Sequence, residues 1–308
     1  MEFPYSIVEE TARALYGRAL KKYPPDLILA IKNAYSRETQ KVAKKHFELM
    51  LSSIELGEKE DRPICQDTGM QTFWVKIGTE LNVDGHLLDT AVREGVRRWS
   101  KENEYRMTVV HPLTREKTGE QTGARHPTIY WDWLPGKDYI EIMMLSKGSG
   151  SENQSFHRML VPAQGVNGIK QFVIDSVLQA GGQFCPPGVA SIGIGGTFDS
   201  VARMAKEALL RPLGSPNPDP EVAKLEEELF AAMNATGIGP MGLGGDTTIF
   251  GCNIEWGVTH ETQNPVALNL QCWAHRKAGS RIHKNGDVEY IYFFGGEGFE
   301  FEGEKIDD

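Results

Sequence analysis

The chain has 308 residues and a mass of 34.3 kDa, enough for one large domain or two of ordinary size. Hydrophobic residues make up 40% and charged residues 24%, proportions that exclude a disordered or fibrous chain. With a formal net charge of −9 and no apolar run near the roughly 20 residues of a membrane span, we expect neither nucleic-acid nor membrane partners. The first residues lack the blocks of a signal peptide, which predicts a cytoplasmic protein.

The N-terminal part of the chain is predicted to be helical. Residues 6–22 carry apolar side chains at helical spacing, and two prolines at 24 and 25 then interrupt the pattern. A second, longer helix is predicted from about residue 26 to residue 56, with an apolar face that covers a core or a partner. We therefore expect an N-terminal helical segment over residues 1–60 and one continuous functional unit over residues 61–308.

Strands and helices are interleaved in the rest of the chain. Runs rich in β-branched and aromatic residues predict strands, and apolar residues at helical spacing predict helices. In chain order these are a strand at 72–78, a helix at 86–101, strands at 129–134 and 139–145, a helix at 166–178, a strand at 189–194, helices at 197–210 and 221–233, and strands near 247–256, 266–270 and 290–294. No regular βαβ repeat is present, so the predicted class is α+β, with mixed β-sheets flanked by helices.

Five loops combine glycine or proline with reactive side chains: residues 62–69, 147–153, 181–187, 237–245 and 269–276. Three of the four cysteines, Cys65, Cys185 and Cys272, lie in these loops rather than inside apolar runs. Four cysteines are too few for a disulfide scaffold, and none has the paired spacing of common zinc sites. Because sites are built on loops held by a rigid scaffold, these three thiols are candidate metal ligands.

Three separated thiolates suit an iron–sulfur cluster in which one iron has no protein ligand and acts as a Lewis acid. Such a site also needs cations and polar donors for substrate carboxylates, and the candidates are Arg62, Gln66, Arg106, Lys147 and Arg276. A zinc ion with a Cys₃His shell remains open, with His260 or His275 as the histidine.

The fourth thiol, Cys252, is interpreted as a buried cysteine beside a strand. The alternative is a fourth ligand, which would close the cluster and remove its Lewis acidity.

Six motifs, in order over about residues 5–285, resemble the iron-dependent class I fumarase and L(+)-tartrate dehydratase family, in its alpha-subunit or N-terminal catalytic part. They are CQDTG at 65–69, KGSGSEN at 147–153, CPP at 185–187, IGGT at 194–197, GIGPMGLGG at 237–245 and QCWA at 271–274. The resemblance implies a 4Fe–4S cluster bound by Cys65, Cys185 and Cys272. It also implies a pocket for a small hydroxy-dicarboxylate, in which Asp67 and His260 are catalytic and which is lined by Gln66, Asp67, Arg106, Gly150 and His260.

The same resemblance implies a separate beta subunit that carries a swivelling C-terminal domain, which we expect to be absent from this chain, in an α₂β₂ assembly. The expected reaction is the reversible hydration of fumarate to (S)-malate, and L(+)-tartrate dehydratase or a methyl-substituted fumarate hydratase (mesaconase) is the alternative. A second class of function is a non-catalytic iron–sulfur protein that carries electrons or acts as a sensor.

Overall fold

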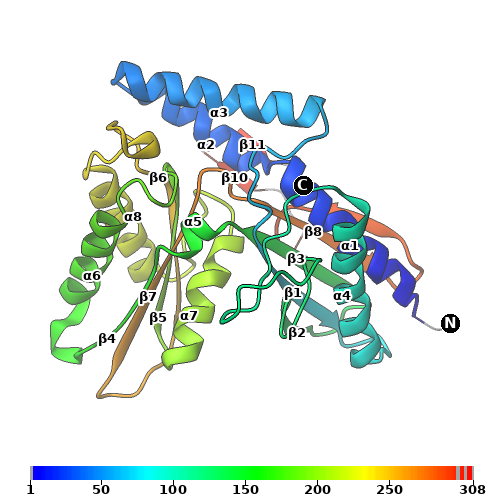
Figure 1. Cartoon of the computed structure of the whole chain (residues 1–308). Helices are drawn as coiled ribbons and strands as arrows, with labels where there is room; N and C mark the ends of the chain where they lie inside the picture. Colours follow the sequence, from blue (N-terminus) through cyan, green and yellow to red (C-terminus); the bar gives the residue numbers. More distant parts are fainter. Residues whose placement is uncertain (1–2, 296–298, 302–303, 307–308) are drawn as a thin grey trace.

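The computed structural model describes residues 3–295 and the backbone of two further short strands, β10 (Phe299–Phe301) and β11 (Glu304–Ile306). Two mixed β-sheets stand side by side, and helices cover their outer faces (Figure 1). The predicted α+β class is therefore confirmed. Among the described residues, no helix is both long and apolar enough to cross a membrane.

The first sheet has the strand order β2–β1–β3–β8–β9, in which β1 and β2 run parallel and the other neighbours run antiparallel. Its strands are β1 (Met70–Gly78), β2 (Thr128–Leu134), β3 (Tyr139–Lys147), β8 (Lys277–His283) and β9 (Val288–Ile291). Side chains alternate between its faces, so Phe73 and Val75 pack under one helical layer while Trp74 joins a different core. That first layer consists of α1 (Tyr5–Lys21) and α4 (Gly85–Glu102).

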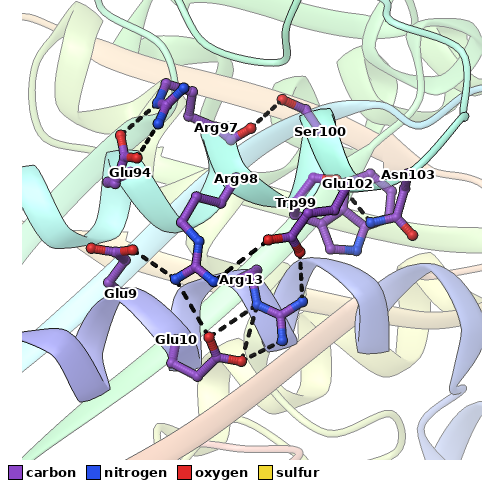
Figure 2. A network of polar contacts seen from close by, with 10 residues as sticks. All are labelled: Glu9, Glu10, Arg13, Glu94, Arg97, Arg98, Trp99, Ser100, Glu102 and Asn103. Carbon is purple, nitrogen blue, oxygen red and sulfur yellow. Dashed lines mark hydrogen bonds and ion pairs between the residues drawn. The ribbon is translucent and has the colours of Figure 1, made fainter.

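Helices α1 and α4 pack against each other as well as on the sheet. Inside, the rings of Tyr16 and Trp99 lie 4.0 Å apart between centroids. On the solvent side, Arg13 and Arg98 form ion pairs with glutamates of both helices (Figure 2). The apolar contact holds the pair together, and the ion pairs lie across its exposed edge.

The second sheet has the order β4–β7–β5–β6, in which β5 and β6 are parallel. Its strands are β4 (Ser155–Leu160), β5 (Gly188–Gly195), β6 (Ile249–Gly257) and β7 (Asn264–Gln271). Along β7, Leu268 and Leu270 face the core beneath α6 (Gly165–Ala180) and α8 (Pro220–Asn234), whereas Ala267 faces α7 (Phe198–Glu207). This strand is therefore buried on both sides.

The single long helix predicted over residues 26–56 is wrong, because two helices occupy this region: α2 (Pro25–Arg37) and α3 (Lys41–Lys59). The chain is extended at Glu38, whose side chain is 2% exposed. The Glu38 carboxylate accepts hydrogen bonds from the N–H groups of Thr39, Gln40 and Asp246 at 3.0–3.1 Å. A buried carboxylate that captures these donors competes with helical bonding and breaks the helix.

Several smaller differences separate the predicted elements from the observed ones. Strands β4 and β8 were not predicted, and the strand predicted at 290–294 ends at Ile291. The helix predicted at 197–210 ends at Glu207 and continues as a 3₁₀ turn (Ala208–Leu210). Two other 3₁₀ turns (Pro162–Gln164 and Pro240–Gly242) and the one-turn helix α5 (Ser149–Glu152) complete the described elements.

Candidate active site

The five loops singled out in the sequence are joined by hydrogen bonds at one end of the second sheet. The N–H of Trp273 donates to the Cys185 carbonyl at 3.2 Å, and the N–H of Met241 donates to the Pro186 carbonyl at 2.8 Å. The Ser151 hydroxyl donates to the side chain of Gln271 at 3.1 Å. These bonds connect four loops that are far apart in the sequence, and Asp67 adds the fifth.

Asp67 lies between three segments of the chain. Its carboxylate accepts hydrogen bonds from the N–H groups of Gly69 at 2.9 Å and Ser149 at 2.8 Å, and its carbonyl accepts one from the Arg276 guanidinium. Partial burial opposes ionisation, but these donors and the Arg276 charge outweigh it and hold the pKa of Asp67 below its usual value. Asp67 is therefore an ionised carboxylate in a fixed orientation.

Glycine at position 148 allows this close approach. A Cβ atom there would lie 3.1 Å from both the Asp67 carboxylate and the Arg276 guanidinium, closer than ordinary contact. Gly150, two residues further on, has open space apart from the Gln183 carbonyl at 3.4 Å from such an atom. Gly148 thus lets the backbone of this loop lie directly beside two charged groups.

Cys185 is within electrostatic range of both other candidate thiols. Burial, and then the negative charges of Cys272 and Cys65, raise the pKa of Cys185. Cys185 also has a φ angle of 57°, a left-handed conformation that is strained for a residue with a side chain. A site in which all three sulfurs are thiolates therefore needs a positive partner, which iron supplies in an iron–sulfur cluster.

Unsatisfied polar atoms are concentrated next to Cys272. Nine buried side-chain nitrogen or oxygen atoms in the described part of the chain lack a hydrogen-bond partner, and five of them belong to residues 269–276. These five are on Asn269, Gln271, His275 (both ring nitrogens) and Arg276. Because buried polar groups are nearly always bonded, this group of unpaired atoms fits a segment that binds a polar or charged group. The three cysteines and the polar atoms around Cys272 thus fit the iron–sulfur cluster that the resemblance implies.

Lys147 is a buried cation behind this segment, with a side chain that is 2% exposed. Its ammonium group donates to the Leu270 carbonyl at 2.5 Å and to the Ser151 hydroxyl at 3.1 Å, and lies 3.5 Å from Glu152. Burial lowers the pKa of Lys147 to about 8, while Glu152 and Cys272 oppose that shift. Lys206 of α7 donates to the other Glu152 oxygen at 2.6 Å.

A cavity of about 690 Å³ opens beside Cys65. Arg62, Gln66 and Arg106 line it together with Cys65, and the Thr68 hydroxyl fixes the Arg106 segment by donating to its carbonyl at 2.7 Å. The structure therefore brings two of the predicted arginines, the glutamine and a candidate ligand to one opening. Its volume is within the range of small-molecule sites.

Two further residues considered in the sequence lie away from these loops, and for Cys252 the interpretation as a buried cysteine is confirmed. Cys252 is buried in β6, beside a separate cavity that Phe250 and Asn253 also line. Exposed His260 lies in the β6–β7 connection, at the end of the sheet away from α5 (Figure 1). The eight residues of β7, about 26 Å at 3.3 Å per residue, separate that end from Cys272. Within one chain, His260 therefore does not reach the cysteine loops.

No three His, Cys, Asp or Glu side chains among the described residues are arranged to hold a single metal ion. In their present positions these side chains therefore do not form the Cys₃His zinc site considered in the sequence analysis. A cubane cluster has a different requirement, because each of its cysteine ligands binds a separate iron. His275, the other possible zinc ligand, is fully buried, and burial together with the Lys277 and Lys147 charges lowers its pKa well below the usual value.

The sequence interpretation missed two neighbours of the site. Glu152 belongs to the KGSGSEN motif at 147–153, and that motif could have indicated it as a neighbour of the site. Lys206 carries no such signal, because it belongs to an ordinary amphipathic helix and reaches Glu152 only through the packing of α7 on the second sheet.

Known proteins resemble this chain over most of its length. Residues 9–281 match the family described as fumarate hydratase (Fumerase). A Methanocaldococcus jannaschii protein that carries the name of an L(+)-tartrate dehydratase subunit alpha is 39% identical over 277 residues, covering 89% of this chain and 97% of that protein. The L(+)-tartrate dehydratase subunit alpha of Escherichia coli strain UTI89 is 31% identical over 270 residues, covering 88% of this chain and 89% of its own length.

Proposed function

Because the chain belongs to the fumarate hydratase (Fumerase) family of hydro-lyases, we propose that it is the alpha subunit of a two-subunit, 4Fe–4S-dependent enzyme that acts on a four-carbon dicarboxylate. One observation carries the proposal: Cys185 lies within electrostatic range of both Cys65 and Cys272, in loops that also hold an ionised Asp67 and line an arginine-containing cavity. This combination suits elimination of water from a substrate with two carboxylates.

Cys65, Cys185 and Cys272 are the residues that would hold the cluster. When bound, it supplies an iron atom without a protein ligand, which serves as a Lewis acid toward the hydroxyl group that leaves as water. Lys147 places a buried positive charge within electrostatic range of the Cys272 thiolate and offsets part of its charge. Arg276, a second buried cation, bonds to the Asp67 carbonyl.

The chain's own residues would bind and orient the diacid. Arg62 and Arg106 line the cavity and offer guanidinium groups, which pair well with carboxylates. Gln66 adds an amide donor in the same cavity. Asp67, held ionised by backbone donors, can accept a hydrogen bond from the hydroxyl group or water at the reacting carbon.

The base that removes the neighbouring proton is expected on a separate beta subunit, and the names of the relatives as alpha subunits support such a partner. We propose an α₂β₂ assembly, as the family resemblance implies, and we propose that it works in the cytoplasm. His260 lies outside the site that one chain forms, so the proposed catalytic group of this chain is Asp67.

Hydration of fumarate to (S)-malate is the first candidate reaction, and the family description supports it. Dehydration of L(+)-tartrate, which releases water and gives oxaloacetate, is the second, and the names of two relatives favour it. In the dehydration direction, L(+)-tartrate differs from malate by one additional hydroxyl group, on the carbon next to the one that loses its hydroxyl.

The test is anaerobic co-expression with the candidate beta chain, followed by assays on fumarate, L(+)-tartrate and mesaconate. We expect a brown protein whose absorption spectrum changes when its substrate is added. Turnover of tartrate alone would replace fumarate as the first candidate, and full turnover by the alpha chain alone would remove the need for a partner.

Matched cysteine variants separate the hydro-lyase from an electron carrier. Cys272→Ala is expected to lose the cluster absorbance and the activity, whereas Cys252→Ala keeps both. Loss of the cluster in Cys252→Ala would show a fourth ligand and support electron transfer instead.

A further inference from the structure

The connection between α4 and β2 is long and has little regular structure. Residues 103–127 are all described, and they form turns and two isolated β-bridges rather than a helix or strand. The tip of this connection, residues 111–119, is exposed throughout, whereas Gln121 is fully buried. Connections of this length usually serve binding or catalysis, and this one brings Arg106 to the cavity beside Cys65. The contacts that fix its base therefore also determine where Arg106 lies.

The oxygen of the Gln121 side chain faces the segment that follows Arg106. It accepts hydrogen bonds from the backbone N–H groups of Thr108 at 2.6 Å and Val109 at 3.2 Å. Because a backbone N–H group can only donate, these two bonds also establish which end of the amide is the oxygen. The backbone two and three residues after Arg106 is therefore bound to Gln121.

The nitrogen of the same amide faces the CQDTG motif at 65–69. Nε2 lies 3.0 Å from the Gly69 carbonyl and 3.2 Å from the Thr68 hydroxyl, and both oxygens can accept its protons. The Thr68 hydroxyl in turn donates to the Arg106 carbonyl at 2.7 Å. Gln121 thus joins the motif to the segment after Arg106, and Thr68 joins the motif to Arg106 itself.

The full burial of Gln121 makes these bonds costly to lose. Water cannot replace its partners, so removal of the amide leaves two backbone N–H groups without an acceptor. The connection would then be less firmly held at its base while its tip stays in solvent. The Arg106 side chain is itself exposed, so it would occupy several positions, of which only some suit pairing with a substrate carboxylate.

We propose that Gln121 is a positioning residue for substrate binding: it fixes the backbone that carries Arg106 against the loop that carries Cys65 and Asp67. The inference rests on the proposed function, because it takes Arg106 as the partner of a substrate carboxylate. It needs no contact between Gln121 and the substrate. Since Gln121 acts only through Arg106, the two residues should behave as one unit in binding.

Gln121→Met in the assembled, cluster-containing enzyme tests this role, because methionine keeps the length of the side chain and removes both polar ends. Steady-state kinetics with fumarate and with L(+)-tartrate should show KM raised at least about tenfold and kcat changed less than about threefold. In a chain that already carries Arg106→Ala, the same substitution should raise KM less than about threefold. Additive effects of the two substitutions, or an unchanged KM in Gln121→Met, would overturn the proposal.

A milder pair of variants tests the same contacts if Gln121→Met does not assemble. The Thr108 hydroxyl donates to the Gly69 carbonyl at 3.2 Å and lies 3.0 Å from the Gln121 nitrogen. Thr108→Val should raise KM about two- to fivefold, and Thr108→Ser, which keeps the hydroxyl, should restore it. The matched control is Thr122→Val, because the Thr122 hydroxyl donates to the Glu120 carboxylate at 2.6 Å, outside these contacts, and it should leave KM unchanged. A Thr108→Val enzyme with the wild-type KM would contradict the proposal.

Amide hydrogen exchange measures these contacts without a cluster, a beta chain or turnover. In the metal-free chain, the N–H groups of Thr108 and Val109 should exchange at least about tenfold faster in Gln121→Met than in the wild type. The amides of β1 should keep their protection, which shows that the variant is folded. Unchanged exchange at residues 108 and 109 would refute the proposal. A wild-type enzyme that turns over no dicarboxylate would instead refute the proposed function, and the exchange rates would still decide whether Gln121 holds this segment.

Discussion

Two polar networks in this molecule have opposite characters. Between α1 and α4, Arg13 and Arg98 pair with Glu9, Glu10 and Glu102 on the surface, where every charge has a partner and contact with water (Figure 2). Around Cys272, the polar groups are buried, and five of their atoms have no partner among the described residues. The exposed network is complete, whereas the buried one is incomplete.

The difference shows how burial sets the energetic importance of a polar group. Exposed ion pairs exchange water contacts for protein contacts at little net gain. A buried polar atom without a partner costs free energy, and a chain keeps several together only where they serve another purpose. The buried network therefore supports the proposed site, although the surface network contains more ion pairs.

The largest expected effect comes from Asp67→Asn in the buried network. The amide keeps the size of the side chain but directs an N–H₂ group at the donors that the carboxylate accepts from, so the activity of the assembled enzyme should fall by on the order of 10²–10⁴-fold. The measurement is kcat with the cluster content determined in parallel. An active Asn variant with a normal cluster would remove Asp67 from catalysis.

Lys147→Met gives an intermediate effect that depends on pH. The folded state lowers the pKa of Lys147 from 10.5 to about 8, so between these values the unfolded chain binds more protons and the stability of the folded chain rises with pH. Relative to the Met variant, the metal-free wild type should gain about 3 kcal/mol of unfolding free energy across this window. Urea titrations at pH 7.5, 9 and 10.5 measure it.

A matched control for this measurement is Lys32→Met, because Lys32 is an exposed lysine of α2. Its variant should follow the wild type at all three pH values. Parallel curves for the wild type and Lys147→Met would contradict a buried, charged Lys147.

Arg13→Gln in the exposed network should have the smallest effect. Arg13 contacts Glu102 at 2.9 Å and Glu10 at 3.0 and 3.1 Å, but its side chain is 30% exposed. We expect a loss of less than about 1 kcal/mol of unfolding free energy, which shrinks further in 1 M salt. A loss as large as that of a core substitution would erase the distinction between the two networks.

Much of the fold could be predicted from the sequence because most elements carry a clear apolar period. The helix break at Glu38 could not, since it depends on an N–H donor from Asp246, more than two hundred residues away. Strand β8 was missed because its small and charged residues do not suggest a strand, and its pairing with β3 and β9 determines its conformation.

The candidate site was predicted more fully in its loops than in its surroundings. Glycine, proline and cysteine identify the loops: glycine allows the backbone to approach charged groups, as at Gly148, proline interrupts regular elements, and cysteine offers a metal ligand. The position of His260 depends on the length and direction of β7, which local patterns do not give. Lys206 likewise reaches the site only through helix packing.

The order of the three cysteines along the chain has a consequence for how the protein is made. Cys65 lies 120 positions before Cys185, which lies 87 positions before Cys272, and the loops between them meet through bonds such as that from Trp273 to Cys185. No short peptide holds the full set of thiols. The ribosome must release most of the polypeptide before these sulfurs can assemble, so a truncated translation product should be unable to acquire iron in this way.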